Sequence, residues 1–494
     1  MSNRKDVLMK TTKAPLALLT LALLSASAAS FAGQIPGKAS DKDIPISHQD
    51  RVYAAEQYSN TVSVVDPVDN KLLGVINLGD PQPGNLSPLY RGEVLVHGMG
   101  FSPDHKTLAV VSIGTNSVSF IDTETNTVKH KTYVGRAPHE AFFTPNGKEV
   151  WVTVRGEDYV SVIDAKTYKE KTRIKTQSGP GMQIFSPDGK YGYVCSSFNP
   201  VTEVFTVADH KKVGEVTQAS PFCPNIAASA DGKQVWFTLK DIGKAQVFEA
   251  KPPFKVLKTL DIGPIANHVN LVNNANGSFA YITVGGLNEV QVYRTDNFEK
   301  VATIKVGRLP HGIWPSGDGT RIYVGLENDD AFAVIDTLTN KLVGDNIPIG
   351  QAPQAIAYVP NAVTKGPGTD NLKPLGLAGQ AEHLSLQVVG KTAEQPATSV
   401  TLFSQGLTQV LQAGVSGLEP KQPYTLALSQ KPDGSGKLEP LLTFMTNPAG
   451  AAVVSTVGPI RQIVQGDTPE QRRYLVIVDG KPDQLGAIRQ VQSQ

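Results

Sequence analysis

Four of the nine histidines lie at matching points of a repeated sequence pattern. They stand in the short sequences Val96-His-Gly, Pro138-His-Glu, Asn267-His-Val and Pro310-His-Gly. The matching points of the other copies hold Met182, Cys223 or Pro224, and Gln354. Neutral imidazole is the commonest metal ligand in proteins, and a set of His, Met and Cys favours copper over calcium or magnesium. The candidate metal ligands are therefore His97, His139, His268, His311 and Met182.

Seven copies of a short strand pattern must position these residues. The copies begin at Arg51-Val-Tyr, Thr107-Leu-Ala, Glu149-Val-Trp, Tyr191-Gly-Tyr, Gln234-Val-Trp, Phe279-Ala-Tyr and Arg321-Ile-Tyr. A period of about 43 residues with several short strands per unit is typical of a β-propeller. The first copy lacks a strand before it, and the segment from Gln354 has none after it. We therefore predict an all-β fold, a seven-bladed propeller over residues 51–360 closed by its C-terminal strand.

The repeat carries turn residues at fixed places. Phe185-Ser-Pro-Asp-Gly and Phe143-Thr-Pro-Asn-Gly end in the dipeptides that tight hairpins require. A following strand alternates in period two, as in Val160-Ser-Val-Ile-Asp. This repeat resembles that of the bacterial YVTN-type β-propeller family, with its Tyr-Val core strand, Val-x-Val-Ile-Asp strand and Ser-Pro-Asp-Gly turn. The resemblance covers residues 51–360 and implies the propeller fold.

The first strand of each blade lines the central channel of a propeller, so the repeated histidines should meet at its mouth. Such a ring is similar to the copper-centre arrangement of nitrous oxide reductases, although four histidines are fewer than that cluster requires. A single axial histidine to a haem, as in nitrite-reductase propellers, is the other cofactor reading. The alternative to both is a hydrated polar rim, because duplication alone spreads Pro-His-Gly through the repeat.

Charged residues in the neighbouring loops should open on the same face. Arg136 and Arg308 each stand three residues before a candidate histidine, and loops between the second and third strands add Glu56, Arg155, Lys240 and Glu327. Such a set could orient a small anionic or polar ligand. The candidate ligand-binding residues are Arg136, Arg155, Arg308, Glu56 and Glu327. An insertion over residues 80–93 lengthens one loop there and is a candidate lid or partner contact.

The N-terminus has the pattern of a signal peptide. Basic residues precede an apolar run from Ala14 to Ala29, and Ser30-Phe31-Ala32 fits a cleavage site. Either Met1 or Met9 could be the true start. We predict a signal peptide over residues 1–32, an extension over 33–50 and an exported protein, periplasmic or extracellular. No later segment approaches the roughly 20 apolar residues of a membrane span.

A different pattern follows the propeller. Residues 361–381 are rich in Gly and Pro and predict a linker. Short alternating strands over residues 382–494 predict a small antiparallel β-sandwich. The only two cysteines, Cys195 and Cys223, lie in neighbouring repeats. In an oxidising compartment they form either one disulfide or two buried thiols.

Composition and absent motifs narrow the function. Lys and Arg number 46 against 45 Asp and Glu, so no basic stripe indicates nucleic-acid binding. The chain has no nucleophile elbow, phosphate-cradling loop or His-Glu-x-x-His. We therefore expect a non-catalytic exported protein that holds a protein partner or small ligand at the propeller hub. The alternative is a copper- or haem-dependent periplasmic oxidoreductase that uses the hub histidines.

Overall fold

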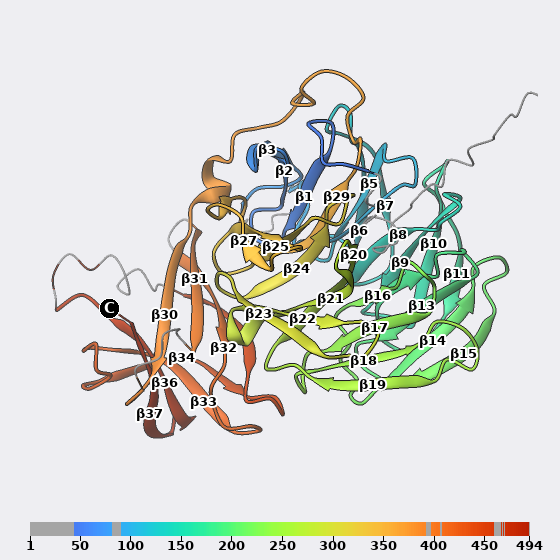
Figure 1. The fold of residues 1–494 in the computed structure, drawn as a ribbon. Helices are drawn as coiled ribbons and strands as arrows, with labels where there is room; N and C mark the ends of the chain where they lie inside the picture. The colour runs from blue at the N-terminus through green and yellow to red at the C-terminus, as the bar shows by residue number, and fades with distance from the viewer. Residues whose placement is uncertain are drawn as a thin grey trace, which may run out of the picture. The chain divides into compact units, whose positions relative to one another are not determined.

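The computed structural model describes residues 44–81, 90–391, 397–405, 408–458, 466, 468 and 470–493. The described residues belong to one compact unit. The predicted signal peptide and most of the insertion over residues 80–93 lie outside the described residues. Within them, seven antiparallel sheets form a propeller, and an eighth sheet follows (Figure 1).

The first four blades follow one another along the chain. They comprise β1 (Arg51–Glu56), β2 (Thr61–Asp66) and β3 (Lys71–Asn77); β4 (Val96–Phe101), β5 (Thr107–Ser112), β6 (Ser117–Asp122) and β7 (Thr127–Tyr133); β8 (Pro138–Phe143), β9 (Glu149–Val154), β10 (Tyr159–Asp164) and β11 (Glu170–Lys175); and β12 (Pro180–Phe185), β13 (Tyr191–Ser196), β14 (Val201–Thr206) and β15 (Lys212–Thr217).

The remaining three blades continue the pattern. They comprise β16 (Ile226–Ala228), β17 (Gln234–Leu239), β18 (Lys244–Glu249) and β19 (Val256–Asp261); β20 (Ala266–Asn274), β21 (Gly277–Val284), the 3-10 turn η1 (Gly285–Leu287), β22 (Glu289–Arg294) and β23 (Lys300–Lys305); and β24 (Pro310–Pro315), β25 (Arg321–Leu326), β26 (Ala331–Asp336), β27 (Lys341–Leu342) and β28 (Ile347–Pro348). The short strands β27 and β28 share the outer position of the last blade.

The last propeller strand, β29 (Pro353–Val359), completes the first blade. It pairs with β1, so that Ala357 faces Tyr53 and Ile356 faces Ala54. The resulting sheet has the order β29-β1-β2-β3. The ring is therefore closed by hydrogen bonds between residues about 300 apart in the chain. This confirms the prediction of a seven-bladed propeller closed by its C-terminal strand.

The turns have the geometry that their residues require. Gly189 and Gly232, in the turns that join the first and second strands of their blades, have φ of 70° and 64°. Residues other than glycine adopt these angles at a steric cost. Asp188 and Asp231 accept hydrogen bonds from the backbone N–H of Lys190 and Lys233 and tighten the same turns.

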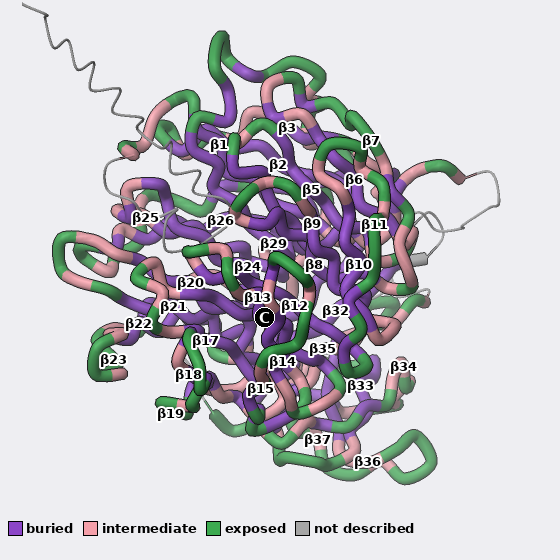
Figure 2. Tube along the Cα trace, turned by 90° about the vertical axis from the view of Figure 1, so that its right-hand side faces the viewer, coloured by how far each residue is buried: buried purple, intermediate pink, exposed green. Residues whose placement is uncertain are grey.

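Burial falls from the centre of the propeller outward (Figure 2). The inner strands β4, β8 and β12 are buried along their whole length, whereas the outer strand β11 is mostly exposed. Trp151 and Trp236 are fully buried. Because successive side chains point to opposite faces of a strand, both faces of an inner strand meet a neighbouring blade. The centre of the propeller is therefore the place where polar side chains lose water.

The C-terminal sheet is antiparallel, as predicted. Its strands are β30 (Glu382–Val388), β31 (Thr398–Gln405), β32 (Thr408–Val415), β33 (Pro423–Ser429), β34 (Leu438–Met445), β35 (Ala452–Gly458), β36 (Tyr474–Lys481) and β37 (Gln484–Gln492). They form one sheet in the order β34-β33-β36-β37-β30-β31-β32-β35, and the two edge strands lie near each other. The sheet therefore curls around its own apolar core, which includes Leu386, Leu411 and Ile477.

The segment between the propeller and this sheet is held against the propeller. The Arg51 guanidinium donates a hydrogen bond to the carbonyl of Pro367, and the Asn126 amide donates one to the carbonyl of Gly368. A backbone bridge joins Val75 to Lys373. The 3-10 turn η2 (Gly376–Gly379) then leads to β30. Among the described residues, no helix has the length and apolar character needed to cross a membrane.

Truncating a core side chain of the closing strand should weaken the whole ring. Ile356 in β29 is 3% exposed, and we expect Ile356→Ala to lower the free energy of unfolding by about 2–4 kcal/mol. The control is Leu342→Ala in β27, where the side chain is 46% exposed and the expected change is below about 0.5 kcal/mol. Urea titration followed by circular dichroism measures both. Equal stability of the two variants would contradict the role of β29.

Candidate functional site

Three histidines occupy the same place in the inner strands of their blades. His97, His139 and His311 each stand two residues before the point where pairing resumes after a bulge. Pairing resumes at Met99 opposite Val110, at Ala141 opposite Val152 and at Ile313 opposite Val324. This common register puts the three imidazoles at one level of the channel, which we call the upper level.

His268 and Met182 belong to a second, lower level. His268 directly precedes Val269, which pairs with Ile282, and Met182 directly precedes Gln183, which pairs with Val194, the residue equivalent to Ile282 in its blade. Glu140 in β8 and Asn225, which directly precedes β16, stand at the same register position. The single level expected from the sequence is therefore two levels. The sequence spacing does not show the two levels, because a bulge near the start of an inner strand shifts the register of the residues around it.

The four imidazoles form one buried cluster. Ring centroids are 4.5 Å apart for His97 and His139, 6.4 Å for His97 and His311, and 4.7 Å for His268 and His311. The exposed fraction of each of the four residues lies between 4% and 8%. The donor atoms of His97, His139 and Glu140 lie within 4.8 Å of one another, the only buried three-residue group of this kind among the described residues.

Hydrogen bonds fix which ring nitrogen of two histidines carries the proton. Nδ1 of His97 lies 3.0 Å from Oε1 of Gln57, which can only accept, so this nitrogen donates. Nδ1 of His311 donates likewise to Oε2 of Glu327 at 2.8 Å. In the neutral rings the proton is then absent from Nε2, which keeps a lone pair for a ligand. Gln57 and Glu327 therefore orient His97 and His311 as donors.

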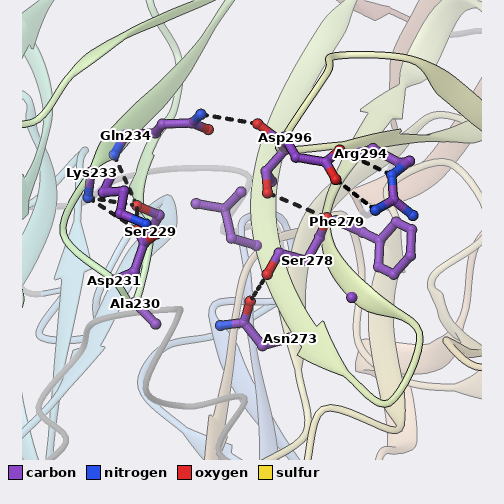
Figure 3. Close-up of a pocket in the computed structure, with 13 residues that line it drawn as sticks. Ser229, Ala230, Asp231, Lys233, Gln234, Asn273, Ser278, Phe279, Arg294 and Asp296 are labelled. Carbon is purple, nitrogen blue, oxygen red and sulfur yellow. Dashed lines mark hydrogen bonds and ion pairs between the residues drawn. The ribbon is translucent and has the colours of Figure 1, made fainter.

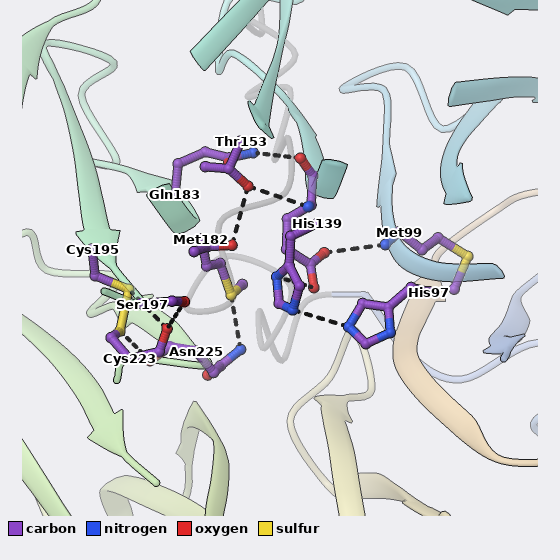
Figure 4. Close-up of polar contacts among 12 residues, drawn as sticks. His97, Met99, His139, Thr153, Met182, Gln183, Cys195, Ser197, Cys223 and Asn225 are labelled. Carbon is purple, nitrogen blue, oxygen red and sulfur yellow. Dashed lines mark hydrogen bonds and ion pairs between the residues drawn. A yellow bond between two sulfur atoms is a disulfide. The ribbon is translucent and has the colours of Figure 1, made fainter. Parts of the chain in front are cut away.

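Nε2 of His139 lies 3.0 Å from Nε2 of His97 (Figure 4). Two nitrogens bound to one metal at about 2.0–2.1 Å and separated by this distance subtend an angle of about 91–97°. That angle is close to the one between adjacent ligands in square-planar or octahedral coordination. In the metal-free pair Nε2 of His139 donates this hydrogen bond to Nε2 of His97, so a metal ion bound by both nitrogens would take the place of that proton.

Burial holds the hub imidazoles in their neutral form. It lowers the pKa of His97, His139 and His268 well below the usual value of 6.5, and neighbouring positive groups lower it further. For His97 these groups are His311 and Arg155. Because a metal binds only the unprotonated nitrogen, the cluster is ready to bind at neutral pH.

The lower level surrounds a narrow channel. A cavity of about 20 Å³ is lined by Glu140, Met182, Asn225 and His268, among others. The Asn225 amide donates to the Met182 sulfur at 3.1 Å, and burial raises the pKa of Glu140 to about 8 (Figure 4). Such a cavity holds about one water molecule. The channel can therefore accept an ion but has no room for an organic cofactor.

The five candidate ligand-binding residues lie in different environments. Arg136 is exposed and donates to the carbonyl of Gly156, while Arg308 pairs with Asp329. Glu56 is fully buried and accepts hydrogen bonds from Thr61 and the Gly350 N–H. Glu327 bonds to His311 and to Gln412 of the C-terminal sheet. Of the three arginines, Arg155 alone has no ion pair among the described residues.

Sequence reasoning missed Glu140, Asn225 and Gln57. Glu140 follows His139 directly, and its place in the inner strand could have marked it as a channel residue. Asn225 directly follows the point that the sequence assigned to Cys223 or Pro224. Gln57 left no comparable signal, because its contact with His97 joins residues 40 apart on different blades.

The two cysteines are bonded to each other. The sulfurs of Cys195 in β13 and Cys223 are 2.13 Å apart, and their Cα atoms 6.0 Å apart (Figure 4). The bond links neighbouring blades, and Cys195 pairs with Met182 in its own sheet. Of the alternatives left open by the sequence, the structure has the disulfide, so Cys223 offers no thiolate to a metal.

A larger groove lies away from the hub, between two neighbouring blades. It measures about 410 Å³ and is lined by residues that include Asp231, Lys233, Asn273, Arg294 and Asp296 (Figure 3). Arg294 pairs with Asp296, and Lys233 pairs with Asp231. Because these charges neutralise each other, the groove does not offer the unbalanced polar groups of a binding site.

A sequence model of the family described as "Cytochrome D1 heme domain" matches residues 102–196. This stretch runs from β5 to β13 and contains His139, Arg155 and Met182. No curated protein matches the sequence significantly.

Three solved structures resemble this chain at low sequence identity. A protein of unknown function from Desulfotomaculum acetoxidans has 14% identity and a TM-score of 0.52, over 62% of this chain and 98% of that chain. Hydrazine synthase from Kuenenia stuttgartiensis has 19% identity and a TM-score of 0.49, over 56% and 94%. The dihydro-heme d1 dehydrogenase NirN has 11% identity and a TM-score of 0.47, over 84% and 77%. The first of these likenesses shows the fold alone.

The family match corrects the leading functional prediction from the sequence. A non-catalytic binding protein or scaffold was expected, and that expectation is wrong. A segment that matches a haem domain and supplies His139 to the hub points to a haem-related redox propeller instead. The alternative, a copper- or haem-dependent protein that uses the hub histidines, agrees better with this finding.

Glu56 should make stability depend on pH. Burial raises the pKa of Glu56 to about 7, above its usual value of 4.5, so folding favours the protonated form. The associated stability is fully present below pH 4.5 and is lost as pH rises through 7, by up to about 3 kcal/mol. Glu56→Gln removes this dependence. Urea unfolding of both proteins at pH 4.5, 6 and 8 measures it, and parallel pH profiles would contradict the assignment.

Proposed function

We propose that this chain is a redox protein that binds a haem at the hub of its propeller, with His97 or His139 as the iron ligand. The observation that carries the proposal is the buried pair of neutral imidazoles, with Nε2 atoms 3.0 Å apart, at the upper level of the channel. The family match adds support, because the matched residues include His139.

The donor set suits a haem iron, since a histidine nitrogen is a common axial ligand. The channel below the imidazoles does not suit a macrocycle, because its cavity of about 20 Å³ holds about one water molecule. A haem would therefore have to lie outside this channel, on the side of the upper level, where His97 or His139 would hold its iron. When bound, the haem supplies one-electron transfer.

The chain's own residues prepare and protect that ligand. Gln57 holds the proton of His97 on Nδ1, which frees Nε2. Burial keeps the imidazoles neutral, and the closed ring of inner strands excludes bulk water from below. Glu327 orients His311 in the same way and is itself held by the amide of Gln412.

A bare copper ion is the second candidate. The spacing of the His97–His139 pair favours it, since both nitrogens can bind one metal ion once His139 gives up its Nε2 proton. The Met182 thioether lies at the lower level as a further soft donor.

The proposal also covers export, cellular location and ligand class. We propose that residues 1–32 are a signal peptide, that the mature chain works in the periplasm, and that its ligand at the hub face is a small molecule. The division into a YVTN-type propeller over residues 51–360, a linker over 361–381 and a C-terminal sandwich over 382–494 remains the prediction from the sequence.

Haem and copper binding test the proposal directly. Protein purified from the periplasm should bind one equivalent of haem with a Soret band of histidine-ligated iron, or one equivalent of copper by elemental analysis. The double variant His97→Ala/His139→Ala should weaken that binding more than about tenfold, because it removes both upper donors.

The matched control is His130→Ala, an exposed histidine on the outer strand β7. It should bind as the wild type does. The proposal fails if neither haem nor copper binds after supplementation, or if the control loses as much affinity as the double variant.

A further inference from the structure

Arg155 stands beside the hub on a fixed backbone. Its N–H donates to the carbonyl of Ala137 at 3.1 Å, two residues before His139. Its guanidinium lies over the ring of Phe222, 5.0 Å from the centroid. The side chain is half-buried. The loop after β9 and an aromatic ring of another blade therefore hold this cation next to the upper level.

Lys240 approaches the same place from a different blade. It directly follows β17, and its N–H donates to the carbonyl of Phe222 at 3.2 Å. Phe222 thus anchors both residues, one through its ring and one through its backbone. Lys240 is also half-buried, and its charge acts on His268, His311 and Glu327 as well as on Arg155.

Neither cation has a carboxylate partner among the described residues, in contrast to the other basic residues near the hub. Arg308 pairs with Asp329 at the edge of its loop, and Arg136 lies 3.6 Å from Glu157 at the surface. The carboxylate of Glu327, whose charge acts on Lys240, is already bound to His311 and Gln412. The two half-buried cations Arg155 and Lys240 therefore have near them one negative charge, that of Glu327, which already has partners.

Such an arrangement costs free energy that an anion would recover. Burial lowers the pKa of Arg155 to about 10 and lowers that of Lys240, and the two cations repel each other. An unpaired half-buried charge is retained at a loss to stability, which is typical of a site that binds something. A guanidinium offers parallel N–H donors that match two oxygens of one planar group, and an ammonium adds a point charge.

We propose that Arg155 and Lys240 form a site for a planar oxyanion of the carboxylate class, next to the hub imidazoles. The anion is either a free small carboxylate or a carboxylate side chain of a haem bound at the hub. Binding of the anion to metal-free protein needs no redox centre. A role for the bound anion beside a redox centre rests on the proposed function.

Acetate is the probe, and neutral acetamide of the same shape is its control. Saturation-transfer NMR of metal-free, full-length protein should show binding of acetate and none of acetamide. Arg155→Gln/Lys240→Met should weaken acetate binding about tenfold or more, because it removes charge-assisted hydrogen bonds. Arg136→Gln, which removes an exposed and already paired arginine, should leave acetate binding unchanged.

A second arm uses protein loaded with haem and separates the two sources of the carboxylate. Acetate that still binds to loaded protein identifies a free anion site. Loss of acetate binding on loading, with haem affinity lowered at least about tenfold in the double variant, identifies the haem carboxylates as the occupants.

Unchanged acetate and haem binding in the double variant would overturn the proposal, provided that its melting temperature matches that of Arg136→Gln. Absence of any acetate binding to wild-type protein, together with a wild-type haem affinity in the double variant, would overturn it too. Failure of the haem and copper tests alone leaves the acetate result standing, so the two proposals fail separately.

Discussion

The hydrogen-bonded pairing of β29 with β1 is the constraint on which the hub depends. It closes the circle of seven blades, and only a closed circle brings the first residues of every inner strand to one axis. The imidazoles of His97, His139, His268 and His311 come from four blades and meet there. If this pairing opened, the blades would still hold their own strands, but water would enter the channel. The burial that keeps the imidazoles neutral would then be lost.

Electrostatics at the hub follows from that burial. Side chains that would ionise freely in water are held there in neutral or weakly charged forms, as the lowered pKa of the histidines and the raised pKa of Glu140 indicate. Such an environment strengthens every remaining charge interaction. Arg155 and Lys240 keep their charge at its edge. The hub therefore combines neutral nitrogen donors in the centre with uncompensated positive charge beside them, a combination suited to a metal centre with an anionic ligand.

The C-terminal sheet contributes to this environment. The Gln412 side chain in β32 bonds to Glu327, and the Asn328 amide bonds to Ser399 in β31. The ring of Phe403 lies 4.8 Å from that of Tyr58, next to Gln57. The residues that orient His97 and His311 are thus backed by a sheet that begins only after the propeller is complete. The C-terminal sheet, which the sequence presents as a separate domain, therefore contributes residues that support the hub site.

The sequence by itself determined the repeat. Its turn residues, its alternating strands and the unpaired strands at its two ends were enough to predict seven blades, their closure and an antiparallel C-terminal domain, because these depend on local geometry and on period. Tertiary structure alone decided which side chains meet. The bulges divide the hub residues into two levels, and folding placed Gln57 against His97, Glu140 near the His97–His139 pair, and both Arg155 and Lys240 against Phe222. These contacts join residues of different blades, and a side chain's distance from the axis depends on bulge, register and ring closure together, which no single stretch of sequence encodes.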